Sequence, residues 1–171
     1  MIRQRAIDLT LCASLAAGLL GGCGYHPLYG SSAETAGVAA IMSSVAIPEA
    51  DTRVGQIVRN DLISGMKPGN GGAPERYTLA LVPTLKSTDV IARPQPATTR
   101  QSVNLVVSYE LTDRQSGSIV SKGKTFSQVS FDVIRQPFAD KQAQDDATAR
   151  AAHEVSSDIR TRLAAYFSTQ Q

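Results

Sequence analysis

The stretch VNLVVSYEL, residues 103–111, decides the fold more than any other part of the sequence. Apolar side chains fall on alternate positions with mostly polar ones between them, which is the period of a half-buried β-strand. The apolar positions are Val103, Leu105, Val107, Tyr109 and Leu111. One face of this strand therefore belongs to a core, and the other face is solvated.

A second strand is predicted directly after it, over residues 118–133, so the two form an antiparallel hairpin. We expect a register that pairs Leu111 with Ile119 and, further along, Val103 with Ser127. The opposite face of the hairpin then collects polar and basic side chains: Asn104, Ser108, Lys122, Lys124 and Gln128.

Two further strands precede this hairpin. Residues 41–47 alternate in the same way and end at Pro48. Residues 77–85 form another strand, in which Pro83 interrupts the alternation and cannot donate to a ladder. That strand therefore lies at an edge of the sheet or is bulged at the proline.

Two helices complete the pattern. Asp51 or Thr52 can cap a helix that ends near Gly65 and Pro68. From residue 139 to residue 167, apolar residues recur every three or four positions, which predicts a long helix. The element order β-α-β-β-β-α implies an α+β fold: a two-layer sandwich over residues 38–171, with both helices on one face of a four-stranded mixed or antiparallel sheet.

The N-terminus has the features of a signal peptide. Arg3 and Arg5 are followed by an apolar stretch, residues 9–20, which is too short to span a bilayer comfortably. The stretch ends in a sequence typical of a bacterial lipobox: Leu20, Gly21, Gly22 and Cys23. Residues 1–22 are therefore predicted to be cleaved and Cys23 to be lipidated; the alternative is an ordinary secretory signal with a cysteine nearby.

The predicted anchor has consequences for location. Stable attachment to a membrane takes two or more acyl chains, which a diacylglyceryl cysteine with an acylated amine supplies. Gly24 is not the aspartate that would favour retention in the inner membrane. We therefore expect residues 23–37 to form a lipid anchor and flexible tether at the periplasmic side of the outer membrane.

Composition excludes several classes of function. Removing residues 1–22 from the 171-residue chain leaves 149 residues, and with them go Arg3, Arg5 and Asp8, so that 15 basic and 14 acidic side chains remain. This balance excludes binding of nucleic acid by bulk charge. With Cys23 lipidated and Cys12 removed, no free thiol remains, and we expect neither a disulfide nor a cofactor.

No catalytic or metal-binding motif emerges. His153-Glu154 resembles the start of a zinc-protease motif, but Ser157 stands where the second histidine is required. A solvated or helix-packing histidine is the better interpretation. Asp145 and Asp146 are adjacent, so they point to different parts of a helix surface, where they more plausibly complement the helix dipole. We therefore expect no enzyme and no metal site.

Four basic residues are the candidates for ligand binding: Arg93, Arg100, Lys122 and Lys124. Their positive charges suit the phosphates of an anionic lipid. The competing interpretation is ordinary solubility.

The sequence CGYHPLY, residues 23–29, resembles the start of mature chains in the LptE family of lipopolysaccharide-assembly lipoproteins. The order of elements, the strand over residues 99–113 and the helical ending over residues 159–167 are similar as well. The resemblance implies an outer-membrane lipoprotein that plugs the LptD β-barrel, assists its assembly and helps deliver lipopolysaccharide to the outer leaflet. It further implies contact with lipopolysaccharide through basic residues.

Two other functions are alternatives to this one. An auxiliary lipoprotein of an ABC-type phospholipid transport system is also an anchored α+β domain of similar size. A periplasmic hydrolase is disfavoured because the sequence offers no plausible triad, metal site or carboxylate pair.

Overall fold

The computed structural model describes residues 33–67, 73–90, 100–133 and 136–170, all within the compact unit Ser31–Gln171. The predicted signal peptide, Cys23 and Arg93 lie outside the described residues. In chain order the elements are α2 (Ala33–Ser43), β1 (Val45–Ala46), α3 (Arg53–Met66), β2 (Tyr77–Val90), β3 (Arg100–Asp113), β4 (Ile119–Asp132) and α4 (Pro137–Ser168).

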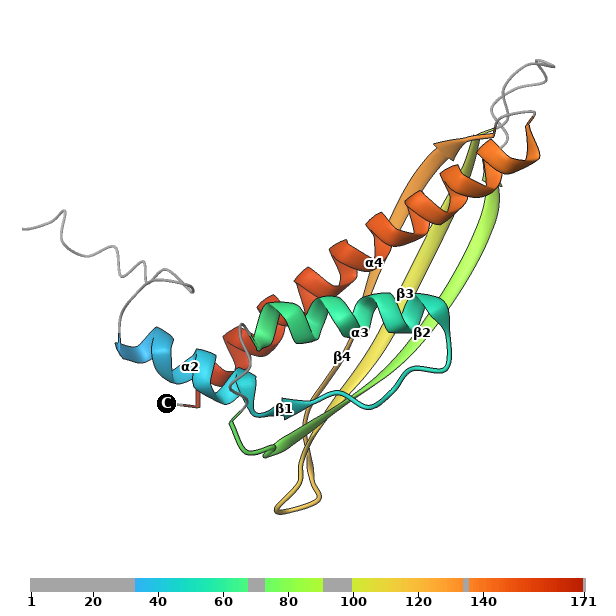
Figure 1. Ribbon diagram of the computed structural model, residues 1–171. Helices are drawn as coiled ribbons and strands as arrows, with labels where there is room; N and C mark the ends of the chain where they lie inside the picture. The colour runs from blue at the N-terminus through green and yellow to red at the C-terminus, as the bar shows by residue number, and fades with distance from the viewer. Residues whose placement is uncertain (1–32, 68–72, 91–99, 134–135, 171) are drawn as a thin grey trace, which may run out of the picture. The chain divides into compact units, whose positions relative to one another are not determined.

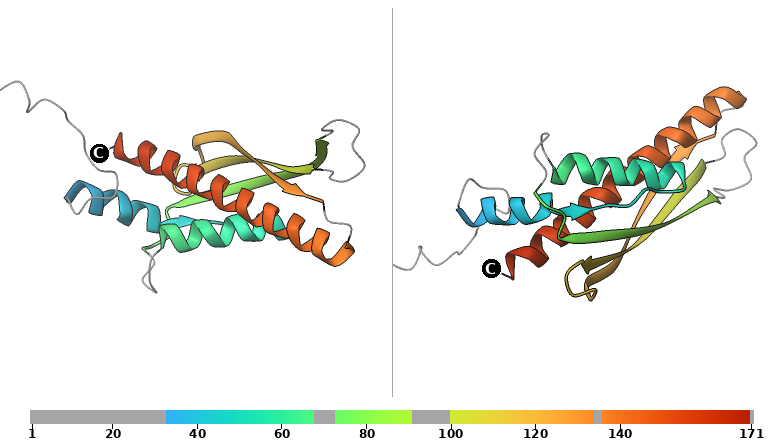
Figure 2. Two further views of the ribbon diagram at one scale, coloured as in Figure 1. Left: turned by 90° about the horizontal axis from the view of Figure 1, so that it is seen from above. Right: turned by 60° about the horizontal axis from the view of Figure 1, so that its bottom comes forward.

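The four strands form one mixed sheet in the order β1-β2-β3-β4. Strand β1 is parallel to β2 and pairs with it only at Tyr77 and Thr78, whereas β3 pairs antiparallel with β2 on one side and with β4 on the other. Helices α3 and α4 lie side by side on one face of the sheet (Figures 1 and 2). The predicted α+β class is confirmed.

Strand β2 shows why Pro83 is tolerated. The Arg114 N–H donates to the Arg76 carbonyl oxygen at 2.9 Å, so the even-numbered positions of β2 bond toward β3, and the nitrogens directed away from β3 belong to the odd-numbered positions. Pro83 is one of these positions, and β1 does not extend to it. Strand β2 is therefore an edge at Pro83, as predicted, although β1 flanks its first two residues. Because the proline costs no ladder bond, the strand continues to Val90 and does not end at residue 85 as predicted.

Strand β3 carries the predicted core face. Its five alternating apolar side chains are all at most 5% exposed: Val103, Leu105, Val107, Tyr109 and Leu111. The prediction of a half-buried strand is confirmed.

The predicted register of the β3–β4 hairpin is wrong by two residues. Thr112 pairs with Ile119, and a bulge then places Leu111 opposite Ser121. The turn before it closes with Gly117 at a φ of 67°, a conformation that glycine adopts without strain. Because side chains alternate with a period of two, a displacement of two leaves each β4 side chain on the predicted face.

Helix α3 begins as its cap predicts. Of the two candidates, Thr52 is the N-cap, and its hydroxyl oxygen accepts a hydrogen bond from the Gly55 N–H at 3.1 Å. Its buried face includes Val58 and Leu62, which pack toward the sheet and α4.

Helix α4 spans 32 residues and contacts α2, α3, β3 and β4. Pro137 occupies its first turn, where a missing N–H costs nothing. Alanines 147, 151 and 152 are fully buried and allow a close approach to the sheet. At its far end Phe167 packs on Tyr77, with 5.2 Å between the ring centroids.

Helix α2 was not predicted. Residues 41–47 were expected to form a strand, but the helix runs to Ser43 and only Val45–Ala46 are extended. Val38 and Met42, one helical turn apart, are both buried. The helix also takes up residues 33–37, which the sequence assigned to the tether.

Candidate functional site

The sheet face opposite the helices is the surface on which the candidate basic residues meet. Even-numbered side chains of β3 and β4 point to this open face, because the odd-numbered ones form the core beneath the helices. Lys122 and Lys124 are both exposed there, two residues apart on β4. The predicted placement of these two lysines on a solvated face is therefore confirmed.

Of the other two candidates, one is ion-paired and one lies outside the described residues. Arg100 lies on the same face, but its guanidinium is 3.5 Å from a carboxylate oxygen of Asp132, its partner residue across the hairpin. Arg93 falls outside the described residues. Lys122 has Glu110 as its cross-strand neighbour. Two of the four predicted cations therefore stand together on the open face without an ion-pair partner among the described residues.

Three further side chains of the open face were not predicted from the sequence. Lys86 lies opposite Asn104, beyond the point where the strand was expected to end. Phe126 and Val82 are 72% and 63% exposed. Because Phe126 occupies a solvent-facing position of β4, the same alternation that found the core could have identified it. The open face thus combines cations with exposed apolar side chains.

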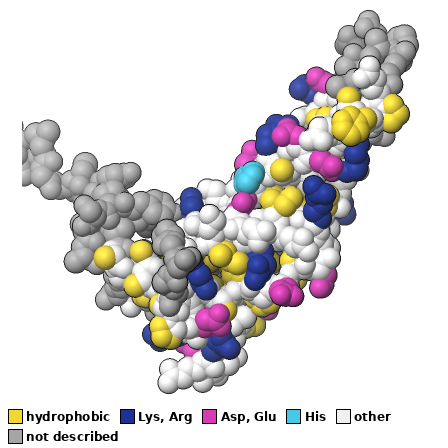
Figure 3. All heavy atoms as spheres, viewed as in Figure 1, with side chains coloured by type: hydrophobic (Ala, Val, Ile, Leu, Met, Phe, Trp, Pro, Cys, Tyr) yellow, Lys and Arg dark blue, Asp and Glu magenta, His cyan; other side chains and the backbone are white. Residues whose placement is uncertain are grey.

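The helix-covered side has a different character. Basic and acidic side chains are interspersed over it, without a broad patch of one sign (Figure 3). Three ion pairs on α4 link residues one helical turn apart: Lys141–Asp145, Arg150–Asp146 and Arg162–Asp158. Asp145 and Asp146 therefore do point to different partners, but they lie past the first turn and pair with these cations, so their predicted role at the helix dipole is wrong.

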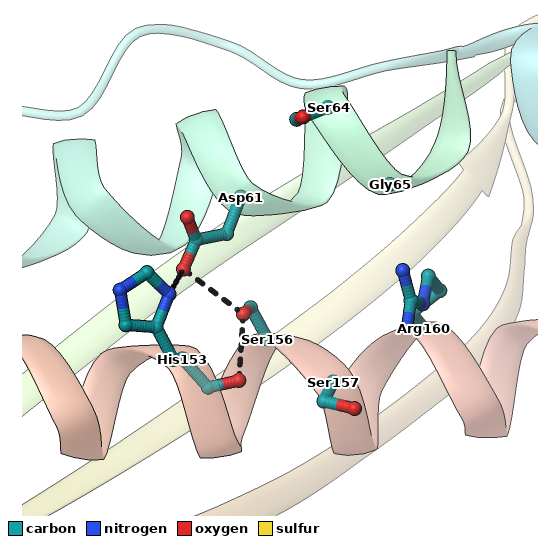
Figure 4. A pocket seen from close by; sticks show the side chains of 7 residues that line it. All are labelled: Asp61, Ser64, Gly65, His153, Ser156, Ser157 and Arg160. Carbon is teal, nitrogen blue, oxygen red and sulfur yellow. Dashed lines mark hydrogen bonds and ion pairs between the residues drawn. The ribbon is translucent and has the colours of Figure 1, made fainter. Parts of the chain in front are cut away.

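A small cavity of about 250 Å³ lies between α3 and α4 (Figure 4). One oxygen of Asp61, on α3, is 2.5 Å from Nδ1 of His153. The Ser156 hydroxyl lies 3.3 Å from the same oxygen and 2.9 Å from the His153 carbonyl oxygen. Ser156 is therefore hydrogen-bonded to the carboxylate and the backbone, and not to the imidazole.

This arrangement differs from a nucleophile–base pair, in which the histidine must accept the hydroxyl proton. Polar contacts beside this cavity instead link α3 and α4, which agrees with the prediction of a solvated or helix-packing histidine, since the His153 side chain is 63% exposed and contacts Asp61. Among the described residues, no group of three or more His, Cys, Asp or Glu side chains could hold a metal ion. In the same part of the chain, no helix is long and apolar enough to cross a membrane.

Comparison with protein families decides the relationship. The family model LptE, described as lipopolysaccharide-assembly, matches residues 42–163, which span β1 to most of α4. The chain belongs to the LptE family. LptE is a non-enzymatic family of lipopolysaccharide-assembly lipoproteins. The match does not support the alternative of an auxiliary lipoprotein of phospholipid transport. No curated protein sequence matches the chain.

Solved structures agree with this assignment. A putative lipoprotein from Caulobacter crescentus CB15 is 30% identical, with a TM-score of 0.63 over 77% of this chain and 96% of that one. A minor lipoprotein from Acinetobacter baumannii is 14% identical, with a TM-score of 0.50 over 71% and 90% of the two chains. The rare lipoprotein B from Shewanella oneidensis is 11% identical, with a TM-score of 0.52 over 71% and 92%. The last two likenesses show the fold alone.

Proposed function

We propose that this LptE-family protein is an outer-membrane lipoprotein that plugs the LptD β-barrel, assists its assembly and takes part in delivering lipopolysaccharide to the outer leaflet. The observation that carries the proposal is the family match over residues 42–163, which includes the whole sheet. The protein acts by binding and positioning, without catalysis.

The proposal includes the anchor. Residues 1–22 are a signal peptide, and Cys23 carries the lipid that holds the domain at the periplasmic side of the outer membrane. The lipobox Leu20-Gly21-Gly22-Cys23 supports cleavage and lipidation, since small residues before the cysteine suit processing of an extended backbone, and Gly24 in place of aspartate supports the outer membrane.

Depletion of the protein tests its role in assembly. We expect the amount of membrane-inserted LptD-type barrel to fall and the lipopolysaccharide barrier to weaken. Affinity purification of the wild-type lipoprotein from detergent-solubilised outer membranes should recover the barrel. Normal barrel levels and normal surface lipopolysaccharide after depletion would contradict the proposal.

Lipopolysaccharide contact is proposed at the open face, through Lys122 and Lys124 with contributions from Arg100 and Arg93. The two lysines are exposed and share one face of β4, so both can reach the phosphates of one anionic lipid. Exposed single ion pairs contribute only about 0.2–1 kcal/mol, so several must act together.

Titration with lipopolysaccharide at two salt concentrations tests this contact. Replacing all four basic residues by alanine should weaken binding and remove most of its salt dependence. A matched control replaces Lys67 and Lys141 by alanine and is compared with the Lys122→Ala/Lys124→Ala double variant, which has the same net charge. If the control and the Lys122→Ala/Lys124→Ala variant bind lipopolysaccharide equally, the glycolipid contact lies elsewhere.

A further inference from the structure

The outer edge of β4 is a second part of the fold that is suited to binding a ligand. Strand β4 is the last strand of the sheet and is 14 residues long, without proline. A long, unpaired edge strand offers a row of backbone donors and acceptors to any extended chain, and proteins generally cover or charge such edges. In the described part of the chain, no strand pairs with this edge.

The backbone groups that point outward can be identified. The Asp113 N–H donates to the Ser118 carbonyl oxygen at 3.0 Å, so the odd-numbered residues of β3 bond toward β4. Their partners after the bulge are the odd-numbered residues of β4. The outward N–H and C=O groups therefore belong to the even-numbered ones: Lys122, Lys124, Phe126, Gln128 and Ser130.

Symmetric pairing of two copies along this edge would bring their α4 helices into conflict. Around Thr125 and Ser127 helix α4 lies over β4, since the hydroxyls of these two residues donate to the α4 carboxylates of Asp158 and Glu154 at 2.5 Å. Two β4 strands would lie about 4.8 Å apart, whereas packed helices need about 8–10 Å between their axes. A single extended segment adds a strand without adding a helix, so it meets no such conflict.

The charge and exposure of the β4 side chains determine which residues that segment should carry. An added strand places its side chains directly beside those of Lys122 and Lys124, about 4.5–5.5 Å away. Neither lysine has an ion-pair partner within the described ranges. Carboxylates at two alternate positions of the segment would compensate both charges, and an apolar residue two positions further would cover Phe126, which is 72% exposed.

We propose that the outer edge of β4 binds an extended segment of the partner barrel by strand addition. The segment carries acidic residues opposite Lys122 and Lys124 and an apolar residue opposite Phe126. This pattern can be met by a segment that runs parallel or antiparallel to β4. This inference rests on the proposed function for the existence of a barrel partner. The carboxylates of the segment lie on the open face, as the lipid phosphates do, but each lysine ammonium has three donors, so the two contacts do not exclude one another.

Cross-linking in the intact complex tests the inference. Ser130→Cys introduces a thiol at an outward position of the edge, and the mature chain has no other free thiol if Cys23 is lipidated. The complex, purified from detergent-solubilised outer membranes, is labelled with a benzophenone maleimide and irradiated. We expect a cross-link to a barrel segment with the acidic pattern, mapped by mass spectrometry. Ser87→Cys, on β2 at the opposite edge, should not reach that segment.

Proline provides an independent test. Ser130→Pro removes an outward N–H and leaves the bonds between β3 and β4 in place, so the melting temperature should change little. Recovery of the barrel should fall about tenfold, since the added strand loses a bond and meets the ring. Ser87→Pro makes the same change at an outward position of β2 and should leave recovery unchanged.

The outcomes separate this inference from the proposed function. If the wild-type protein recovers the barrel, but Ser130→Pro recovers it equally, strand addition at β4 is refuted and the proposed function stands. Cross-links from Ser130→Cys only to lipopolysaccharide, or to a second copy, also overturn the inference. If the wild-type protein recovers no barrel, the proposed function itself fails and the inference fails with it.

Discussion

Gly123→Ala should destabilise the domain, although alanine is ordinarily the better residue within a strand. Gly123 lies opposite Tyr109 in the β3–β4 pair. A Cβ added there would stand 2.5 Å from the Tyr109 hydroxyl oxygen, 2.7 Å from Cζ and 2.9 Å from Cε1. Tyr109 is 5% exposed, so its ring cannot swing into solvent without disturbing the packing around it.

The expected size follows from two opposing effects. Forcing an extra methyl group into a packed core costs about 1–3 kcal/mol. Replacing glycine also reduces the entropy of the unfolded chain, which stabilises by about 0.5–1 kcal/mol. The net loss is therefore about 0–2.5 kcal/mol, with a midpoint of about 1.3 kcal/mol that corresponds to a fall of roughly 3–6 °C in melting temperature for a domain of this size.

Thermal and urea unfolding of the unit Ser31–Gln171 measure this loss. The control introduces Gly123→Ala into a Tyr109→Ala background, where the methyl group has room. There the substitution should be neutral or stabilising, so a double-mutant cycle should show a coupling of more than about 1 kcal/mol. A Gly123→Ala variant that melts above the wild type would refute the packing argument.

Three further predictions concern the anchor, the core and acid stability. Cys23→Ala should abolish incorporation of a clickable fatty acid; label retained at the wild-type level would contradict the anchor. Val107→Asp places a carboxylate at a fully buried position and should cost several kcal/mol, enough to unfold a marginal domain; circular dichroism checks this, and a wild-type melting curve would contradict it. Burial raises the pKa of Asp158, but hydrogen bonds from Thr125 and Arg162 outweigh burial and hold the pKa below its ordinary value of 3.8. The stabilisation from ionised Asp158 is present above pH 3.8 and is lost as the pH falls through the lowered pKa. Asp158→Asn should therefore be less stable than the wild type at neutral pH and should lose less stability on acidification. Acid unfolding curves that run parallel for the two proteins would contradict this.

Segments with a regular apolar period were predictable, because burial of one face requires apolar residues at the spacing of a strand or of a helix. The core face of β3, the cap at Thr52 and the long C-terminal helix all follow from local patterns. The register of the hairpin could not be predicted, since the bulge next to Leu111 depends on how the two strands twist together.

Helix α2 was missed because a short apolar stretch fits two periods. Residues 41–47 alternate over a few positions, yet Val38 and Met42 have the spacing of a helix, and Ala39 and Ala40 between them favour one. At the candidate site the sequence could place Lys122 and Lys124 on a solvated face. It could not show that Arg100 is paired with Asp132, because that contact depends on the true register.

The contacts of α4 have a consequence for how the chain reaches its native state. The last apolar residue of that helix, Phe167, packs on Tyr77, ninety positions earlier in the chain, and α2 meets α4 across an even longer separation. Contacts of such high sequence separation slow folding, because long loops must close before they form. The sheet therefore has no helical cover along most of β4 until the C-terminal residues have emerged and docked. The nascent domain should be vulnerable to proteolysis for that interval, and a chain stopped before Phe167 should be degraded faster than one that includes it.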